Sequence, residues 1–192
     1  MIESVAITLL PAGFLAYVFI AAPLLLQKNI DLDGEAPINR AVFYASKYAI
    51  LGVWGIMALA GFGIGFSPFG VSRLLQLIAL GRWGFGFALL YIGRSGMEDS
   101  FRIGTPKEET RLRTGGLFGL CRNPMYVGVY ATAAASALYT LDPVVILMGV
   151  FVVAVHHRIV LAEEKHMRAA FGRDYESYCS RVHRYLPIPS GR

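Results

Sequence analysis

The chain has 192 residues, a length that suits one domain, and 55% of them are hydrophobic while only 16% are charged. This balance excludes an ordinary soluble globular protein and indicates one embedded in a membrane. The net charge of +5 is explained by basic residues that flank apolar segments, so it requires no nucleic-acid surface. We therefore expect membrane lipids as partners, and nothing in the sequence calls for nucleic acid or an obligate protein partner.

Five apolar segments are long enough to cross, or nearly cross, a bilayer. They comprise residues 7–26, 42–66, 74–92, 126–141 and 143–160. Asp142 and Pro143 form the only turn between the last two, because proline lacks a backbone donor and is tolerated at the first helical position. The sequence predicts an all-α integral membrane protein of about five transmembrane helices, with a tight hairpin of helices four and five.

The basic residues predict the orientation of these helices. Nearly all lysines and arginines in the connections lie in residues 27–41, in residues 94–123 and after residue 160, whereas Arg73 alone lies in an opposite connection. Positive residues are retained in the cytoplasm, which predicts an outside amino terminus, a cytoplasmic tail and a site facing the cytoplasm. Lys47 and Arg82, near helix ends, are interpreted as side chains that reach the membrane interface.

The tail after the fifth apolar segment is predicted to be folded. Residues 163–171 favour a helix, Gly172 is a natural helix stop, and Asp174 can begin a second short helix that runs to Val182. We interpret residues 1–192 as one domain, with three helices in residues 1–93 and the polar chemistry in residues 94–192. Glycines 61 to 65 and 81 to 86 lie within apolar helical segments, which favours close helix packing over a phosphate loop.

Two polar clusters, residues 108–126 and 156–166, flank the predicted hairpin. Because the two helices are antiparallel, the clusters meet at one surface. The side chains expected to converge there are Arg122, Asn123, Tyr126, Arg158, Glu163 and Glu164. They favour either a site or an ion-pair clamp. His156, His157 and His166 of the second cluster, with its glutamates, lack the ligand spacing of a metal site.

A resemblance follows from two motifs around this hairpin. The run LRTGGLFGLCRNPMYVG at 112–128, followed by EEKHMRAAFGRDYESYCSRVHRYLP at 163–187, resembles the isoprenylcysteine carboxyl methyltransferase family of membrane enzymes. The similarity covers about residues 94–188. In that family an Arg-His-Pro-x-Tyr motif and a Glu-Glu pair together hold S-adenosylmethionine. Asn123 stands where histidine is commonest, a variant typical of prokaryotic members.

The resemblance implies a set of site residues. Those expected to bind the cofactor are Thr110, Arg111, Leu112, Arg113, Phe118, Asn123, Pro124, Met125, Tyr126 and Glu163. The resemblance also implies a substrate-orienting arginine, for which Arg158 is the nearest candidate, and Glu164 completes the expected catalytic pair. Physical chemistry agrees with this set, because carboxylate and aromatic groups suit the cofactor's cations and arginine suits its carboxylate.

The implied reaction is methyl transfer to the carboxylate of a prenylated cysteine or a similar lipophilic acceptor, with S-adenosylhomocysteine as product. A carboxylate is already ionised at neutral pH and needs no general base. The main alternative is a phospholipid amine methyltransferase, which needs a base such as Glu164, His157 or His166. An NADPH-dependent membrane reductase and a non-enzymatic scaffold are further alternatives, and residues 99–113 suit either a closing lid or an ordinary loop.

Overall fold

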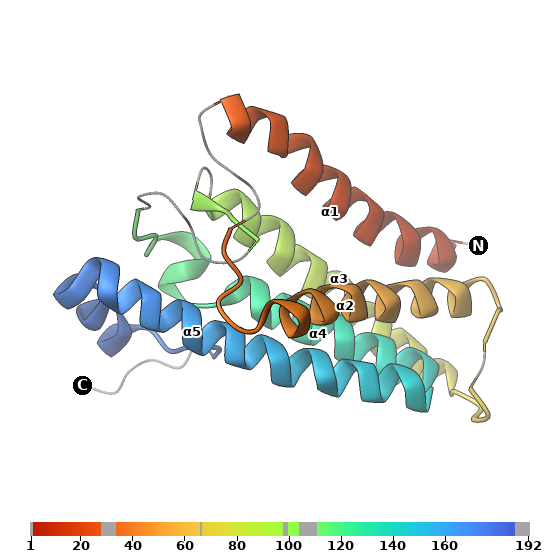
Figure 1. The fold of residues 1–192 in the computed structure, drawn as a ribbon. Coiled ribbons are helices and arrows are strands. Elements are labelled where there is room, and N and C mark those ends of the chain that lie inside the picture. Colours follow the sequence, from red (N-terminus) through yellow and green to blue (C-terminus); the bar gives the residue numbers. More distant parts are fainter. Residues whose placement is uncertain (1, 28–33, 66, 98–99, 104–110, 187–192) are drawn as a thin grey trace.

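The structure, a computed structural model, describes residues 2–27, 34–65, 67–97, 100–103 and 111–186. These residues form an all-helical protein, which confirms the predicted fold class (Figure 1). Its elements in chain order are α1 (Ile2–Gln27), α2 (Arg40–Gly61), α3 (Arg73–Met97), the short 3-10 helix η2 (Gly116–Gly119), α4 (Pro124–Thr140) and α5 (Pro143–Arg181).

Four of the described helices, α1, α2, α3 and α5, are long and apolar enough to cross a membrane by length and composition. The fifth predicted span, α4, has 17 residues and corresponds to about 25 Å of helix, slightly less than a bilayer core. Much of α4 is buried among the other helices. The chain is therefore a membrane protein whose shortest helix lies inside the bundle.

Two helix ends differ from the predicted ones. The helix α5 does not end near Val160 but continues to Arg181, with a kink at Gly172, whose φ of 48° is left-handed. The expected helical tail and its break at Gly172 are thus confirmed, as a continuation of the fifth helix. The helix α2 ends at Gly61 instead of residue 66, because the chain turns at Gly63, where φ is 82°.

The predicted hairpin between α4 and α5 is confirmed. The Asp142 side chain accepts hydrogen bonds from the amides of Val144 and Val145 at 2.8 and 3.3 Å, so it caps α5, and Pro143 occupies the first turn. The preceding Leu141 adopts a left-handed conformation, with φ of 45°, that ends α4. A two-residue connection therefore suffices to reverse the chain.

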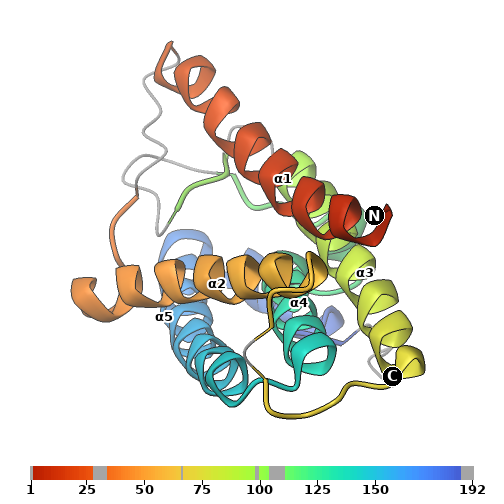
Figure 2. The ribbon, with the colours of Figure 1, turned by 90° about the vertical axis from the view of Figure 1, so that its right-hand side faces the viewer.

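The helices alternate in direction, which sorts the connections to two ends of the bundle (Figures 1 and 2). At one end, Arg73 of α3 pairs with Glu3 of α1, and Ser67 donates to the Leu141 carbonyl at 3.1 Å. From this end α1 and α2 diverge, whereas Tyr17 of α1 stacks on Tyr91 of α3 with ring centroids 6.0 Å apart. The opposite end holds the start of α4 and the end of α5.

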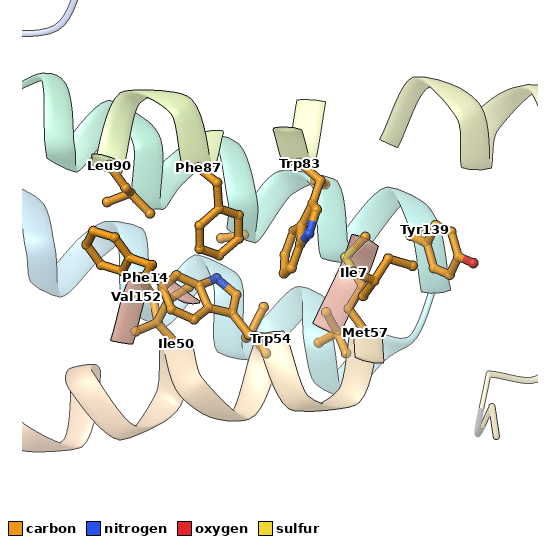
Figure 3. Close-up of a cluster of buried hydrophobic side chains, with 14 of the residues drawn as sticks. Ile7, Phe14, Ile50, Trp54, Met57, Trp83, Phe87, Leu90, Tyr139 and Val152 are labelled. Carbon is orange, nitrogen blue, oxygen red and sulfur yellow. The ribbon is translucent and has the colours of Figure 1, made fainter. Parts of the chain in front are cut away.

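The centre of the bundle is an aromatic core (Figure 3). The Trp83 and Phe87 rings of α3 lie 4.9 Å apart between centroids, and Trp54 of α2 lies 5.0 Å from Phe87. The indole N–H of Trp54 donates to Thr132 Oγ1 of α4 at 3.0 Å, so the buried polar atom is satisfied. This core holds α2, α3 and α4 in register.

Close packing of α3 against α4 depends on two glycines. A Cβ atom added at Gly128 would lie 2.7 Å from the Gly86 carbonyl oxygen and 3.0 Å from Leu90 Cγ. These contacts confirm the packing role expected for Gly86. A Cβ atom added at Gly84 would meet nothing within 4 Å.

We expect Gly128→Ala to destabilise the protein by about 1–3 kcal/mol, because the methyl group forces two backbones apart. Gly84→Ala is the matched control, and we expect it to be neutral or to stabilise by about 0.5–1 kcal/mol, since alanine is the better helix former. Thermal unfolding in detergent measures both. Equal unfolding temperatures for the two variants would contradict the close approach.

Candidate functional site

A buried carboxylate joins the segments at the α4 start and the α5 end. Glu164 is 2% exposed, and its Oε1 accepts from Arg122 Nη2 at 2.9 Å. Its Oε2 accepts from Arg184 Nη2 at 2.8 Å, while Asn123 Nδ2 donates to Oε1 at 3.4 Å. Because both oxygens accept from guanidinium groups, which stay protonated, Glu164 is held as a carboxylate and is poorly suited to act as a base.

The same arginine binds the chain that follows α5. Arg122 Nη1 donates to the Val182 carbonyl at 2.8 Å, and the Arg122 amide donates to the His183 carbonyl at 2.9 Å. The hydrogen bond to Glu164 raises the pKa of Arg184 above its ordinary value. Burial raises the pKa of the neighbouring Cys121 thiol, so this cysteine is not an activated nucleophile.

The adjacent carboxylate, Glu163, faces a different set of groups. The Tyr126 hydroxyl donates to Glu163 Oε1 at 2.8 Å. The Tyr126 ring meets His156 edge-on, with centroids 5.7 Å apart. The His156 Nδ1 lies 2.8 Å from the Val152 carbonyl, which requires a proton on Nδ1 and leaves Nε2 as an acceptor in the neutral ring.

These side chains border a cavity of about 490 Å³, within the range of about 300–1,000 Å³ typical of ligand pockets. Its polar part lies where α4, α5 and the chain before α4 meet. Its apolar part extends between α1 and α2, where these helices diverge. The residues that line this apolar part include Phe14, Leu15, Val18, Tyr44, Tyr48, Leu51 and Trp54.

Most residues selected from the sequence line this one cavity. They are Arg111, Leu112, Arg113, Phe118, Asn123, Pro124, Met125, Tyr126, Glu163 and Glu164. Thr110, residue 99 and residues 104–110 lie outside the described residues, so the lid hypothesis concerns a segment that the structure describes only in part. The roles of the lining residues in binding stay predictions.

The structure does not bring Arg158 into the cavity. Its side chain is exposed on α5, and it is absent from the cavity lining. The reason is helical phase: at about 100° per residue, Arg158 points about 140° away from Glu163, whereas His156, seven residues before Glu163, shares its face. Proximity in sequence to the glutamate pair is therefore not proximity in space.

Several lining residues were not selected from the sequence. Lys47 of α2 borders the cavity, as do His156, Tyr175 and Tyr178 of α5. Lys47 follows Phe43 by four residues and precedes Ile50 by three, and both neighbours are buried. This helical spacing was the available signal, because it places Lys47 on the buried face of α2.

Fold and cavity together define an all-helical membrane protein with a ligand-sized cavity at one end of its bundle. Residues 71–174 match the family model described as phospholipid methyltransferase, so the chain belongs to the phospholipid methyltransferase family. This family is part of the isoprenylcysteine carboxyl methyltransferase superfamily. No curated protein and no solved structure matches the chain. The chain is a membrane methyltransferase, and membership in the family implies S-adenosylmethionine as methyl donor.

We expect Glu164→Gln to destabilise the polar end by about 3 kcal/mol, because Arg122 and Arg184 then lose a buried counter-charge. The segment after α5 should detach, and tryptic cleavage after Arg181 and Arg184 should become faster. Glu176→Gln, at an exposed position of the same helix, is the control. Unchanged protease resistance in Glu164→Gln would show that the ion pairs of Glu164 with Arg122 and Arg184 do not hold this segment.

Proposed function

We propose that this membrane methyltransferase transfers a methyl group to the carboxylate of a lipophilic acceptor, such as a prenylated cysteine, at the cytoplasmic border of the membrane. The observation that carries the proposal is the continuity of one cavity from a polar corner at Glu163 and Tyr126 to an apolar region between α1 and α2. A water-soluble donor and a lipid-soluble acceptor require these two environments side by side.

The residues that line the polar part of the cavity fit S-adenosylmethionine. This cofactor presents a sulfonium, an ammonium, a carboxylate and an adenine ring. The Glu163 carboxylate and the Tyr126 ring suit the cations, Arg113 suits the carboxylate, and Phe118 suits the adenine. The Tyr178 hydroxyl donates to the Phe118 carbonyl at 2.6 Å, which holds the segment carrying this ring against α5.

The charge of the cavity favours an anionic acceptor. Among the described residues that line it, the cationic side chains are Lys47, Arg102, Arg111, Arg113 and Arg122, against the carboxylates Glu163 and Glu164. Arg122 and Glu164 already neutralise each other. When bound, S-adenosylmethionine supplies an electrophilic methyl group and a net positive charge. A carboxylate complements that charge and is ionised at neutral pH, whereas a protonated amine adds to it.

The apolar part of the cavity suits the acceptor's hydrocarbon chain. It extends between α1 and α2, two helices apolar enough to lie in lipid, so a prenyl chain bound between them would stay out of water. The basic residues gathered at the same end of the bundle support a cytoplasmic orientation of the site.

A phospholipid amine is the second candidate acceptor, and the family description favours it. Such an acceptor must lose a proton, and the structure offers His156, whose ring borders the cavity and whose Nε2 carries the lone pair in the tautomer that the Nδ1 contact requires. The sequence alone had suggested Glu164, His157 or His166 for this role; of the two histidines, His166 also lines the cavity and His157 does not. The two candidates therefore differ in their dependence on a base.

To test the proposal, we would measure transfer of labelled methyl from S-adenosylmethionine to N-acetyl-S-farnesylcysteine and to phosphatidylethanolamine, with protein purified in non-ionic detergent. We expect base-labile label on the farnesylated acid. Glu163→Gln should weaken cofactor binding about ten- to hundredfold, the loss typical of a hydrogen bond to a charged group. The exposed Glu176→Gln should bind and react like the unmodified protein.

Two outcomes would contradict separate parts of the proposal, namely the carboxylate acceptor and the role of Glu163. Base-stable label on phosphatidylethanolamine alone, lost in His156→Gln, would replace the carboxylate acceptor by an amine. Unchanged cofactor affinity in Glu163→Gln would remove Glu163 from the cofactor site.

A further inference from the structure

Lys47 is a cation at the junction of the two parts of the cavity. Its Nζ lies 4.9 Å from the centroid of the Phe43 ring and 6.0 Å from that of Tyr126, the tyrosine that binds Glu163. On α2, Tyr44, Tyr48 and Leu51 lie within four residues of Lys47, before and after it, and belong to the apolar part. Lys47 is half-buried and lines the cavity together with residues of the apolar region and of the corner where methyl transfer is proposed.

The structure provides Lys47 with aromatic contacts instead of a dedicated counter-ion. Within the described residues, no carboxylate forms an ion pair with its ammonium. Glu163 attracts Lys47 electrostatically, but one of its oxygens accepts from Tyr126. Glu164 is saturated by Arg122 and Arg184. A half-buried cation without an ion pair of its own among the described residues retains the capacity to bind an anion.

We propose that Lys47 binds the anionic group of the methyl acceptor and thereby positions its head beside Tyr126 and Glu163; this inference rests on the proposed function. An amphiphile with its chain between α1 and α2 reaches Lys47 where the apolar lining ends. An ammonium on a flexible stem can contact a carboxylate or a lipid phosphate there. Lys47 takes the place that the sequence assigned to Arg158, which is exposed and absent from the cavity lining.

The position of Lys47 also assigns acceptor selection to a part of the chain outside the family match. The matched segment is 71–174, whereas Lys47 and the apolar lining of α1 and α2 precede it. The donor candidates from Arg111 to Glu163 lie within the match. Acceptor preference can therefore change through α1 and α2 without altering the donor site.

The experiment measures ligand binding, so it does not depend on turnover. In non-ionic detergent, S-adenosylhomocysteine affinity is measured first by titration calorimetry. The cofactor-saturated protein is then titrated with N-acetyl-S-farnesylcysteine, with its carboxamide and with lysophosphatidylethanolamine. The variants are Lys47→Met, which keeps the apolar stem, Lys47→Arg, which keeps the charge, and Arg82→Met, an exposed control outside the cavity.

We expect the unmodified protein and Lys47→Arg to prefer the acid over the carboxamide by about tenfold or more, the scale of one charge-assisted hydrogen bond. Lys47→Met should bind the acid and the carboxamide equally, with normal S-adenosylhomocysteine affinity, and Arg82→Met should keep the preference. If the acid has no advantage but Lys47→Met loses affinity for lysophosphatidylethanolamine, the anion is a phosphate, and only the carboxylate part of the proposed function fails.

Two results would overturn the assignment of Lys47. One is unchanged affinity of Lys47→Met for all three ligands, which leaves the cofactor site intact. The other is loss of S-adenosylhomocysteine binding in a folded Lys47→Met, which would make Lys47 a cofactor residue. Absence of cofactor binding in the unmodified protein would instead overturn the proposed function itself, together with the inference that rests on it.

Discussion

The polar end of the protein depends on one buried charge, the Glu164 carboxylate. A charge with 2% exposure is tolerated only with close counter-charges, so Arg122 and Arg184 must lie against it. Arg122 lies two residues before the start of α4, and its side chain and backbone also donate to carbonyls after α5. A single ion cluster therefore joins three chain segments that are distant in sequence, and it determines where α4 begins relative to α5.

The two neighbouring glutamates, Glu163 and Glu164, have different partners and therefore different roles. Glu164 is fully engaged by its ion pairs with Arg122 and Arg184. The Glu163 side chain points about 100° away around the helix axis and accepts a hydrogen bond from Tyr126. Tyr126 lies in the first turn of α4, which begins at Pro124, and its hydroxyl donates to Glu163 Oε1 at 2.8 Å. The sequence left an ion-pair cluster and a ligand site as alternatives, and the structure shows an ion-pair cluster whose members Arg122 and Glu164 also line the cavity.

The methyl-donor candidates and the acceptor region come from different parts of the chain. The donor candidates lie in the connection before α4 and in the two helices of the hairpin, where the backbone is held by caps and ion pairs. The apolar region is bounded by α1 and α2, which meet at one end and diverge toward the other (Figure 2).

The sequence by itself determined the features that depend on neighbouring residues: the apolar segments, the Asp142-Pro143 turn and the break at Gly172. Through the antiparallel hairpin it also predicted that Asn123 and Tyr126 meet the glutamates. It did not determine which faces of the helices meet. Arg158 was selected by closeness in sequence, although helical phase turns it outward, and Lys47 was taken for an interfacial lysine, although α2 packs its face against the cavity. Only the tertiary structure decided these two cases, because a side chain's partners depend on the rotation and crossing of neighbouring helices, which apolar composition leaves undefined.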